Sequence, residues 1–126
     1  DVYIADTMGE LGLFYRACPL VFVGKSLAVG GGQNPAEPAL MGCALVLGPD
    51  MSNFRDMTAE LLAAGAATQV SSPAALTAAL DALLKDATLG RNQGEKARTF
   101  MADHSRALEE TLSNLAPLLA APAHLR

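Results

Sequence analysis

Two short stretches of the sequence combine small, polar and acidic residues in a pattern that suits ligand binding. The first runs from Thr7 to Glu10 (T-M-G-E), and the second runs from Gly30 to Glu37 (G-G-G-Q-N-P-A-E). In both, a residue that can cap a helix stands three places before a glutamate, which is the spacing of a capping box. Helix starts attract anions because their first backbone N–H groups are unpaired and carry a partial positive charge. Both stretches are therefore candidate sites for a nucleotide-type ligand.

In the second stretch, three flexible glycines precede the expected helix start and two conformationally restricted prolines lie in its first turn. The three glycines from Gly30 to Gly32 permit positive φ and a close approach of a ligand to the backbone. Asn34 is the expected cap, Pro35 suits the first helical position, and Pro38 still falls within the first turn. The simpler alternative is that both stretches only cap helices and turn the chain. The dinucleotide fingerprint does not follow the first strand, and no P-loop motif is present.

Four short apolar runs alternate with helical periodicities, which is typical of an α/β protein. Because the runs are almost continuously apolar, we expect parallel strands that are covered on both faces. This pattern predicts a Rossmann-like open parallel sheet with right-handed crossovers, in which ligands bind at the carboxyl ends of the strands. The expected strands are Val2 to Asp6, Leu20 to Gly24, Ala44 to Gly48 and Ala67 to Val70.

The helices expected between and after these strands each show one apolar face. Gly65 is expected to end one helix, and Ser72 with Pro73 to begin the next. The last helix is expected to end before Pro117, so that residues 1–115 form the domain and residues 116–126 a tail. A short helix is also expected around Pro35 to Met41. The apolar faces of the four longer helices are Leu11, Phe14, Tyr15 and Cys18; Phe54, Met57, Leu61 and Leu62; Leu76, Leu80, Leu83 and Leu84; and Ala97, Phe100, Met101, His104, Leu108, Leu112 and Leu115.

The composition argues against several classes of protein. The chain has 126 residues, of which 51% are hydrophobic, so it can form a core. Its net charge of −4, with no basic stripe, gives no indication of a nucleic-acid surface. Cys18 and Cys43 lack metal-ligand spacing and are both expected to be buried. His104 and His124 are isolated, so no metal site is expected.

Three short motifs occur in order along the chain: D-T-M-G-E-L (6–11), G-G-x-N-P-x-E (31–37) and G-P-x-x-x-N-F (48–54). In residues and in order they resemble the 3-deoxy-D-manno-octulosonic acid (Kdo) transferases of lipopolysaccharide synthesis. The resemblance implies the C-terminal, donor-binding half of a GT-B glycosyltransferase, which has two Rossmann-like domains around a cleft. It also implies transfer of Kdo from CMP-Kdo to a lipid A precursor, without a cofactor.

The resemblance assigns binding roles to two groups of residues. The segments that match CMP-binding segments of the family are Met8, Gly9 and Glu10, and Asn34, Pro35, Ala36 and Glu37. The Glu37 carboxylate suits a ribose, because it can accept hydrogen bonds from two vicinal hydroxyls. The family's catalytic base, a third donor segment and the lipid acceptor site are expected outside this chain. The resemblance therefore implies a fragment that is inactive alone and contains no catalytic residue.

The same resemblance implies a place at the cytoplasmic face of the bacterial inner membrane, peripheral or anchored through an N-terminal part. Two alternatives remain open: the donor-binding half of another GT-B enzyme that uses a UDP-sugar, or a non-catalytic α/β domain. Gln33 and Lys25 depart from the family pattern, and Lys25 can either reach an anionic sugar or stay solvated. Asn53 can either lie near the ligand or form a simple helix cap with Asp56.

Overall fold

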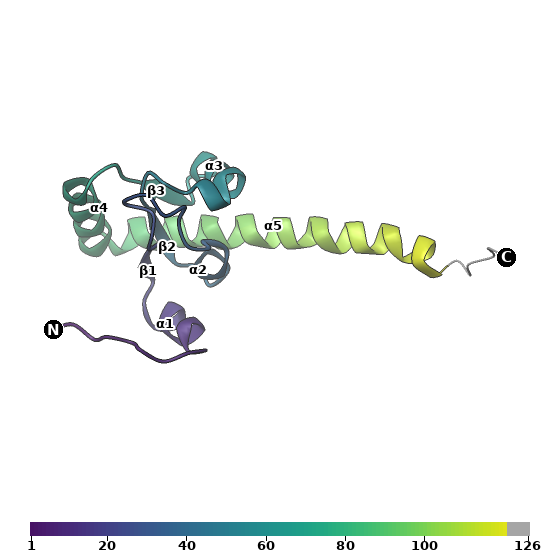
Figure 1. Cartoon of the computed structure of the whole chain (residues 1–126), viewed down its shortest axis with the longest axis horizontal. Helices are drawn as coiled ribbons and strands as arrows, with labels where there is room; N and C mark the ends of the chain where they lie inside the picture. The colour runs from purple at the N-terminus through teal and green to yellow at the C-terminus, as the bar shows by residue number, and fades with distance from the viewer. Residues whose placement is uncertain (121–126) are drawn as a thin grey trace.

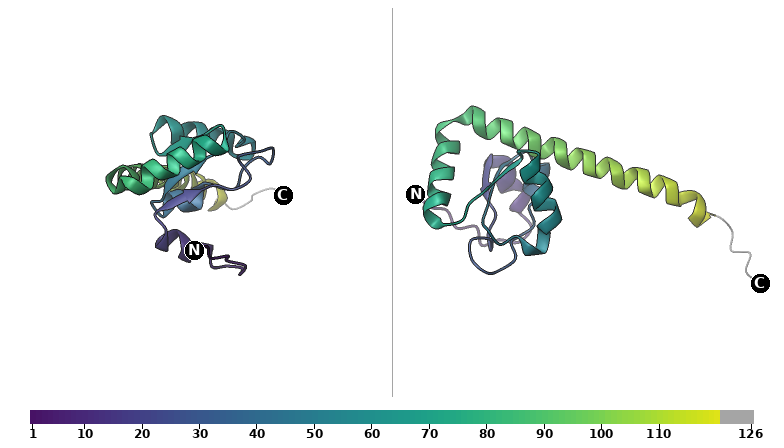
Figure 2. Two further views of the ribbon diagram at one scale, coloured as in Figure 1. Left: turned by 90° about the vertical axis from the view of Figure 1, so that its left-hand side faces the viewer. Right: turned by 90° about the horizontal axis from the view of Figure 1, so that it is seen from above.

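The computed structural model describes residues 1–120 as a small α/β body from which one long helix projects (Figures 1 and 2). The elements in chain order are α1 (Leu11–Ala17), β1 (Leu20–Phe22), α2 (Ala36–Leu40), β2 (Ala44–Leu47), the 3-10 helix η1 (Ser52–Phe54), α3 (Arg55–Ala63), β3 (Ala67–Gln69), α4 (Pro73–Lys85) and α5 (Ala87–Ala120).

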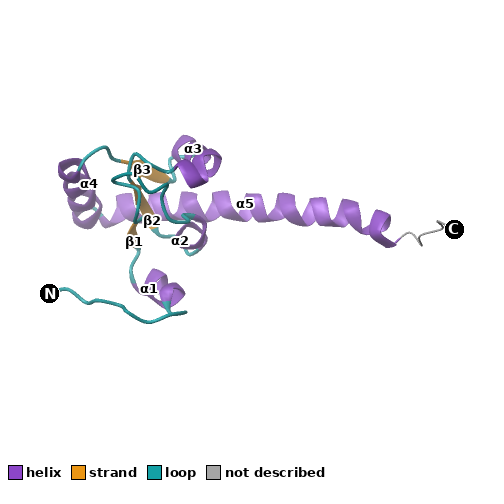
Figure 3. Ribbon diagram, in the orientation of Figure 1, coloured by secondary structure: helices purple, strands orange, loops and turns teal. Residues whose placement is uncertain are grey.

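The three strands form a parallel sheet in the order β1-β2-β3, in register at Leu20 with Ala44 and at Leu45 with Ala67 (Figure 3). All four residues of β2 are buried, which is why the run from Ala44 to Leu47 is apolar without alternation. One face of the sheet packs on α2, α3 and α5 through a core cluster that includes Leu45, Leu47, Leu61 and Ala97. The other face packs on α4 through Ala44, Val46, Val70 and Leu83. The predicted parallel, doubly covered sheet is confirmed.

The predicted N-terminal strand, Val2 to Asp6, is wrong for this chain. The segment is irregular and runs beside α1, and Val2, Tyr3 and Ile4 are 91%, 79% and 81% exposed (Figure 1). A strand requires a neighbour to receive its backbone hydrogen bonds, and no strand pairs with this segment in the described structure. Its anchor is a tilted ring contact between Tyr3 and Phe14, with centroids 6.0 Å apart.

The local signals at the middle helices are confirmed. The Ser72 hydroxyl accepts a hydrogen bond from the Ala75 N–H at 3.2 Å, and Pro73 is the first residue of α4. Gly65 follows α3 with a positive φ of 64°, as expected after a helix end. On α4, however, Leu84 is 73% exposed, so the predicted apolar face is narrower than expected.

Helix α5 differs most from the prediction at its C-terminal end. It continues past Pro117 to Ala120, so the predicted end before Pro117 is wrong. An interior proline removes one backbone N–H and crowds the carbonyl four residues earlier, which is why a helix end was expected there. The projecting part exposes Leu112 and Leu115 by 56% and 43%. None of the helices formed by residues 1–120 combines the length and apolar character needed to cross a membrane. Most of the predicted tail, residues 121–126 with His124, lies outside the described residues.

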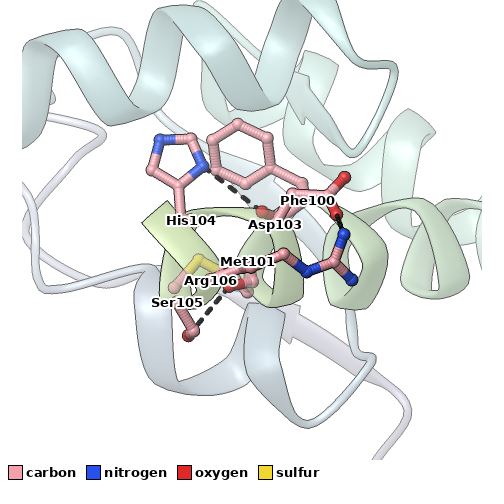
Figure 4. A network of polar contacts seen from close by, with 6 residues as sticks. All are labelled: Phe100, Met101, Asp103, His104, Ser105 and Arg106. Atoms are coloured by element: carbon pink, nitrogen blue, oxygen red, sulfur yellow. Dashed lines mark hydrogen bonds and ion pairs between the residues drawn. The ribbon is translucent and has the colours of Figure 1, made fainter. Parts of the chain in front are cut away.

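The middle of α5 is tied to α3 by His104. Its Nε2 lies 3.1 Å from Glu60 Oε2, and its ring contacts the Phe100 ring at a centroid distance of 4.2 Å. In the same turns, His104 Nδ1 lies 3.3 Å from the Phe100 carbonyl and the Ser105 hydroxyl donates to the Met101 carbonyl (Figure 4). His104 therefore packs on Phe100 and contacts the Glu60 carboxylate on the α3 side of the helix.

Candidate functional site

A pocket of about 510 Å³ opens between α1, the carboxyl end of β1 and the start of α2. We call it the Glu37 pocket. It lies where ligands bind in open α/β sheets, outside the carboxyl ends of parallel strands. Its lining residues are Leu11, Tyr15, Val21, Phe22, Val23, Gly24, Gln33, Asn34, Glu37 and Pro38.

The Glu37 carboxylate is the acidic group of this pocket. It is exposed and has no hydrogen-bond or ion-pair partner among the described residues. A Cβ placed on Gly12 of α1 would lie 3.6 Å from Glu37 Oε1, so the side chain stands beside the first turn of α1. Burial, together with the nearby Glu37 charge, raises the pKa of Tyr15 above its ordinary value. Tyr15 therefore remains a neutral hydroxyl donor beside an unpaired carboxylate.

The predicted cap of α2 at Asn34 is wrong by one residue, because the N-cap position is occupied by Pro35, which has no side-chain cap bond. Asn34 Oδ1 accepts a hydrogen bond from the Ala36 N–H at 2.9 Å, while the helix itself begins at Ala36 rather than Pro35. Pro35 and Pro38 are both buried under this start. The expected capping-box bond from Glu37 back to the chain is not formed in the described part of the structure. The glutamate is consequently available to a ligand.

The start of α1 is not where the sequence pattern placed it. Gly9 has a φ of +85°, which interrupts the backbone before the helix, and α1 begins only at Leu11. The Thr7 hydroxyl donates to the Glu10 carboxylate instead of capping the helix backbone. Met8, Gly9 and Glu10 therefore precede the first turn, and Met8 is 98% exposed. The structure brings Asn34 and Glu37 to the pocket but leaves Met8 to Glu10 outside its lining.

The backbone N–H groups of the glycine loop donate hydrogen bonds to other groups of the protein. The N–H groups of Gly30 and Gly31 donate to Asp50 Oδ2 at 2.8 and 3.0 Å. The N–H groups of Gly32 and Gln33 donate to the carbonyls of Lys25 and Gly24 at 2.9 and 3.0 Å. None of these four donors is free, so the loop differs from a phosphate-cradling loop, in which the N–H groups face the ligand.

The special backbone of the loop is also explained by internal packing. Gly31 and Gly32 have φ values of 77° and 75°, which side-chain-bearing residues rarely adopt. A Cβ on Gly31 would collide with the Asn53 side chain, and one on Gly32 would collide with Met51. Since the Asn53 N–H also donates to the Gly31 carbonyl at 3.0 Å, Asn53 braces the glycine loop. It does not form the cap that was the simple alternative for α3.

Asp50 is the residue that the sequence analysis missed. Its Oδ1 accepts from the Ser52 N–H and hydroxyl at 3.2 and 2.8 Å, while its Oδ2 accepts from the two glycines. These bonds, those from Gly30 and Gly31 first, hold the pKa of Asp50 well below its usual range. The available signal in the sequence is an aspartate directly after Pro49 at the end of an apolar run.

Ser26 joins the first two loops beneath Asp50. Its buried hydroxyl donates to the Val23 carbonyl at 2.5 Å and accepts from the Gly48 N–H at 2.8 Å. The Ser26 carbonyl accepts from the Asp50 N–H at 2.9 Å. The loops after β1 and β2 are thus fastened to each other by both side-chain and backbone bonds.

The two cysteines lie near the C-terminal end of α1 and differ in exposure. Cys43 is buried, as predicted, and its Sγ lies 3.2 Å from the Tyr15 carbonyl. Burial first, and then Cys18, raise the pKa of the Cys43 thiol. Cys18 is exposed, because it follows the last turn of α1 rather than belonging to its inner face, so its predicted burial is wrong.

Comparison with curated proteins gives a consistent set of relatives. The chain is 39% identical over 117 residues, 91% of its length, to the 3-deoxy-D-manno-octulosonic acid transferase of Bordetella pertussis. It is 33% identical to proteins of the same name from Rickettsia typhi and Haemophilus influenzae, each over 94% of this chain. The chain spans only 27%, 26% and 28% of the length of these relatives, in that order. No protein-family model matches it.

Among solved structures, the chain is similar to the C-terminal CMP-Kdo binding domain of WaaA from Acinetobacter baumannii. The TM-score is 0.73 with 31% sequence identity, over 78% of this chain and 51% of that one. The fold is accordingly that of a Rossmann-like domain of a GT-B glycosyltransferase. More particularly, the chain belongs to the 3-deoxy-D-manno-octulosonic acid transferase family and corresponds to the C-terminal part of its members. The fold class and the family expected from the sequence are confirmed.

Proposed function

We propose that this chain binds CMP-Kdo as the donor half of a Kdo transferase, with the nucleotide in the Glu37 pocket. The observation that carries the proposal is the unpaired Glu37 carboxylate beside Asn34 in a pocket at the carboxyl ends of the strands. A carboxylate with both oxygens free can accept from the two hydroxyls of a ribose. The structural relative is named as a CMP-Kdo binding domain, which supports the same ligand.

The proposed CMP-binding residues remain those of the two family segments. They are Met8, Gly9, Glu10, Asn34, Pro35, Ala36 and Glu37. Of these, Asn34 and Glu37 line the pocket as it stands. Met8, Gly9 and Glu10 adjoin it through α1, whose first residue, Leu11, is part of the lining. Tyr15 adds a neutral hydroxyl to the same pocket.

The complete reaction requires groups that this chain does not supply. In our proposal, the donor half holds CMP-Kdo while the catalytic base and the lipid A precursor come from the rest of the enzyme. Transfer of Kdo would then serve lipopolysaccharide synthesis at the cytoplasmic face of the inner membrane. The chain spans only 27%, 26% and 28% of the length of these relatives, which is consistent with a second half of that kind.

Nucleotide preference tests the proposal. Calorimetric titration of the chain with CMP, and separately with UMP, should give binding of CMP and clearly weaker binding of UMP. Preference for UMP would point to a UDP-sugar enzyme instead. No heat with either nucleotide, from a chain whose circular dichroism shows intact helices, would indicate a non-catalytic α/β domain.

A further inference from the structure

The glycine loop, residues 30–33, carries the chain from the loop after β1 into the Glu37 pocket. Gln33 and Asn34 line that pocket, and Glu37 stands three residues further on. The two glycines before Gln33 have positive φ values and are buried. Glycine has more accessible backbone conformations than other residues, so a loop of this composition keeps one shape only where surrounding groups hold it.

The Asp50 carboxylate is the side-chain anchor of this loop. Its Oδ2 accepts from the N–H groups of Gly30 and Gly31 at 2.8 and 3.0 Å. Within residues 1–120, no other side chain hydrogen-bonds the loop, and the remaining bonds of the loop all join backbone atoms. A substitution of Asp50 therefore loosens the loop without altering a side chain of the pocket.

Asp50 is itself held in place by the loop after β2. Its Oδ1 accepts from the Ser52 N–H and hydroxyl at 3.2 and 2.8 Å, and its own N–H donates to the Ser26 carbonyl at 2.9 Å. The hydrogen bonds that the carboxylate accepts lower its pKa, so the side chain is fully charged at neutral pH. Hydrogen bonds to a charged group are about twice as strong as neutral ones. The charge of Asp50 thus contributes directly to the hold on the loop.

The effect of Asp50 on a ligand has to pass along the chain, because Asp50 does not line the Glu37 pocket. Asn34 follows the glycine loop, and its Oδ1 accepts from the Ala36 N–H at the start of α2. Helix α2, which carries Glu37, has only five residues. A helix this short is not stable by itself, so its position depends on the segments that hold it. These are the glycine loop on one side and two buried prolines on the other.

We infer that Asp50 is a positioning residue for the donor, which holds the glycine loop so that Asn34 and the Glu37 carboxylate meet the ribose. This inference rests on the proposed function, because the proposed function places the ribose at Glu37. It extends that function by making ribose recognition depend on a residue of the loop after β2, outside the pocket.

The preference for ribose over deoxyribose reports the position of the Glu37 carboxylate. The nucleotide 2′-deoxy-CMP lacks one of the two hydroxyls that can donate to this group. In calorimetry, the wild-type chain should bind CMP about tenfold more tightly than 2′-deoxy-CMP, the factor that corresponds to 1.4 kcal/mol. In Asp50→Asn, which keeps the size of the side chain but removes its charge, the preference should shrink to about threefold, half of that free energy. The backbone bonds of the loop and the buried prolines account for the half that remains.

Two control variants separate positioning from a general loss of stability. Ser52→Ala removes the hydroxyl bond to Asp50 Oδ1 and leaves both glycine bonds on Oδ2, so it should keep the wild-type preference. Ser72→Ala removes the cap of α4 and should lower the melting temperature while it also keeps the preference. If Ser72→Ala loses the preference as far as Asp50→Asn does, the loss reflects stability and the inference is overturned.

The same coupling can be measured in the wild-type chain, without any substitution. Coupling between two sites is reciprocal, so CMP should strengthen the hold on the loop if that hold strengthens CMP binding. Exchange of the Gly30 and Gly31 amide hydrogens with solvent should therefore slow when CMP saturates the chain. The Ala75 amide, which is bonded in the cap of α4, is the control and should exchange equally with and without CMP. Unchanged exchange at the two glycines, or equal slowing at Ala75, would overturn the inference.

The outcomes for the inference and for the proposed function differ. A tenfold ribose preference that is the same in wild type and Asp50→Asn overturns the positioning role of Asp50 and leaves the proposed function in place. A wild-type chain that does not bind CMP, or that binds CMP and 2′-deoxy-CMP equally, removes the proposed role of Glu37 and the inference with it.

Discussion

At the scale of single residues, Asp50 is the group that holds the glycine loop in place. Its carboxylate accepts hydrogen bonds from the N–H groups of Gly30 and Gly31, and Gln33, two residues after Gly31, lines the Glu37 pocket. Asp50→Asn removes the charge and one acceptor oxygen, so we expect a lower melting temperature at neutral pH. Asp81→Asn, which loses only an exposed ion pair with Lys85, is the control and should change little.

The pH dependence of this variant follows from the lowered pKa of Asp50. A carboxyl whose pKa is depressed by folding stabilises the folded state fully above its unfolded pKa, about 3.9. That stabilisation is lost as the pH falls from there through the depressed value of the folded state. The difference in melting temperature between wild type and Asp50→Asn should therefore be constant near neutrality and shrink below about pH 4. A difference that is the same at pH 7 and pH 3 would contradict this account.

Glu37 is predicted to act on the ligand and not on the fold. Because its carboxylate is unpaired, Glu37→Gln should leave the melting temperature unchanged while weakening CMP by about tenfold, the equivalent of 1.4 kcal/mol. Calorimetry and thermal unfolding of the same samples measure the two effects. Glu95→Gln on α5 is the matched control. Unchanged CMP affinity in Glu37→Gln would remove this glutamate from the site.

The cysteines should differ in reactivity because they differ in exposure and thiolate content. Cys18 is exposed, whereas Cys43 is buried and its thiol pKa is raised, so it supplies little thiolate at neutral pH. A chromogenic disulfide reagent should modify one thiol quickly in the native chain and the second only on unfolding. Cys18→Ser should abolish the fast phase. A fast phase that survives in Cys18→Ser would mean that Cys43 is accessible.

At the scale of elements, the position of α5 depends on a close approach between two glycines. A Cβ on Gly94 would overlap the carbonyl oxygen of Gly42, which follows α2. Gly94→Ala should therefore push α5 away from the body and destabilise the chain by about 1–3 kcal/mol, as overpacking does. Gly90 is four residues earlier in the same helix, and its Cβ would make only an ordinary contact, 3.7 Å from the Leu83 carbonyl.

Gly90→Ala is consequently the control, because it is expected to change the free energy of unfolding in the opposite direction from Gly94→Ala. Alanine is favoured over glycine inside a helix by about 1 kcal/mol, so this variant should be neutral or more stable. Urea unfolding of the two variants beside the wild type measures both effects. Equal effects of the two substitutions would show that Gly94 serves helix propensity only, and not packing.

The elements that could be predicted from sequence are those whose signals are local or whose burial is complete. The run from Ala44 to Leu47 is apolar because β2 is buried on both faces, and the cap at Ser72 requires only its own turn. The predictions that were wrong depend on neighbouring elements of the fold, which a local sequence pattern does not reveal. Whether Val2 to Asp6 pairs depends on a neighbouring strand, and whether Pro117 ends α5 depends on the whole helix around it.

The candidate site could be predicted only in part for the same reason. Asn34 and Glu37 carry a recognisable local pattern, and the structure places both in one pocket. The role of Asp50 could not be read from its neighbours, because its partners, Gly30 and Gly31, are twenty and nineteen positions away. Glycine is also required at positions 31 and 32 because the side chains of Asn53 and Met51 leave no room there for a Cβ, and this packing cannot be seen in the sequence.

At the scale of the whole molecule, the described structure combines an edge strand, β1, with exposed apolar residues in the N-terminal segment. Among residues 1–120, strand β1 pairs only with β2, and Val2, Tyr3 and Ile4 are exposed close to α1. Exposed edges and strand-forming segments tend to pair between chains. The chain should therefore self-associate as its concentration rises, and light scattering after size exclusion measures this.

The double variant Val2→Lys, Ile4→Lys should reduce association, since lysine opposes edge pairing. Leu112→Lys with Leu115→Lys, which alters the exposed apolar residues of α5, should leave this association in place. A monodisperse wild-type monomer at all concentrations would refute the prediction.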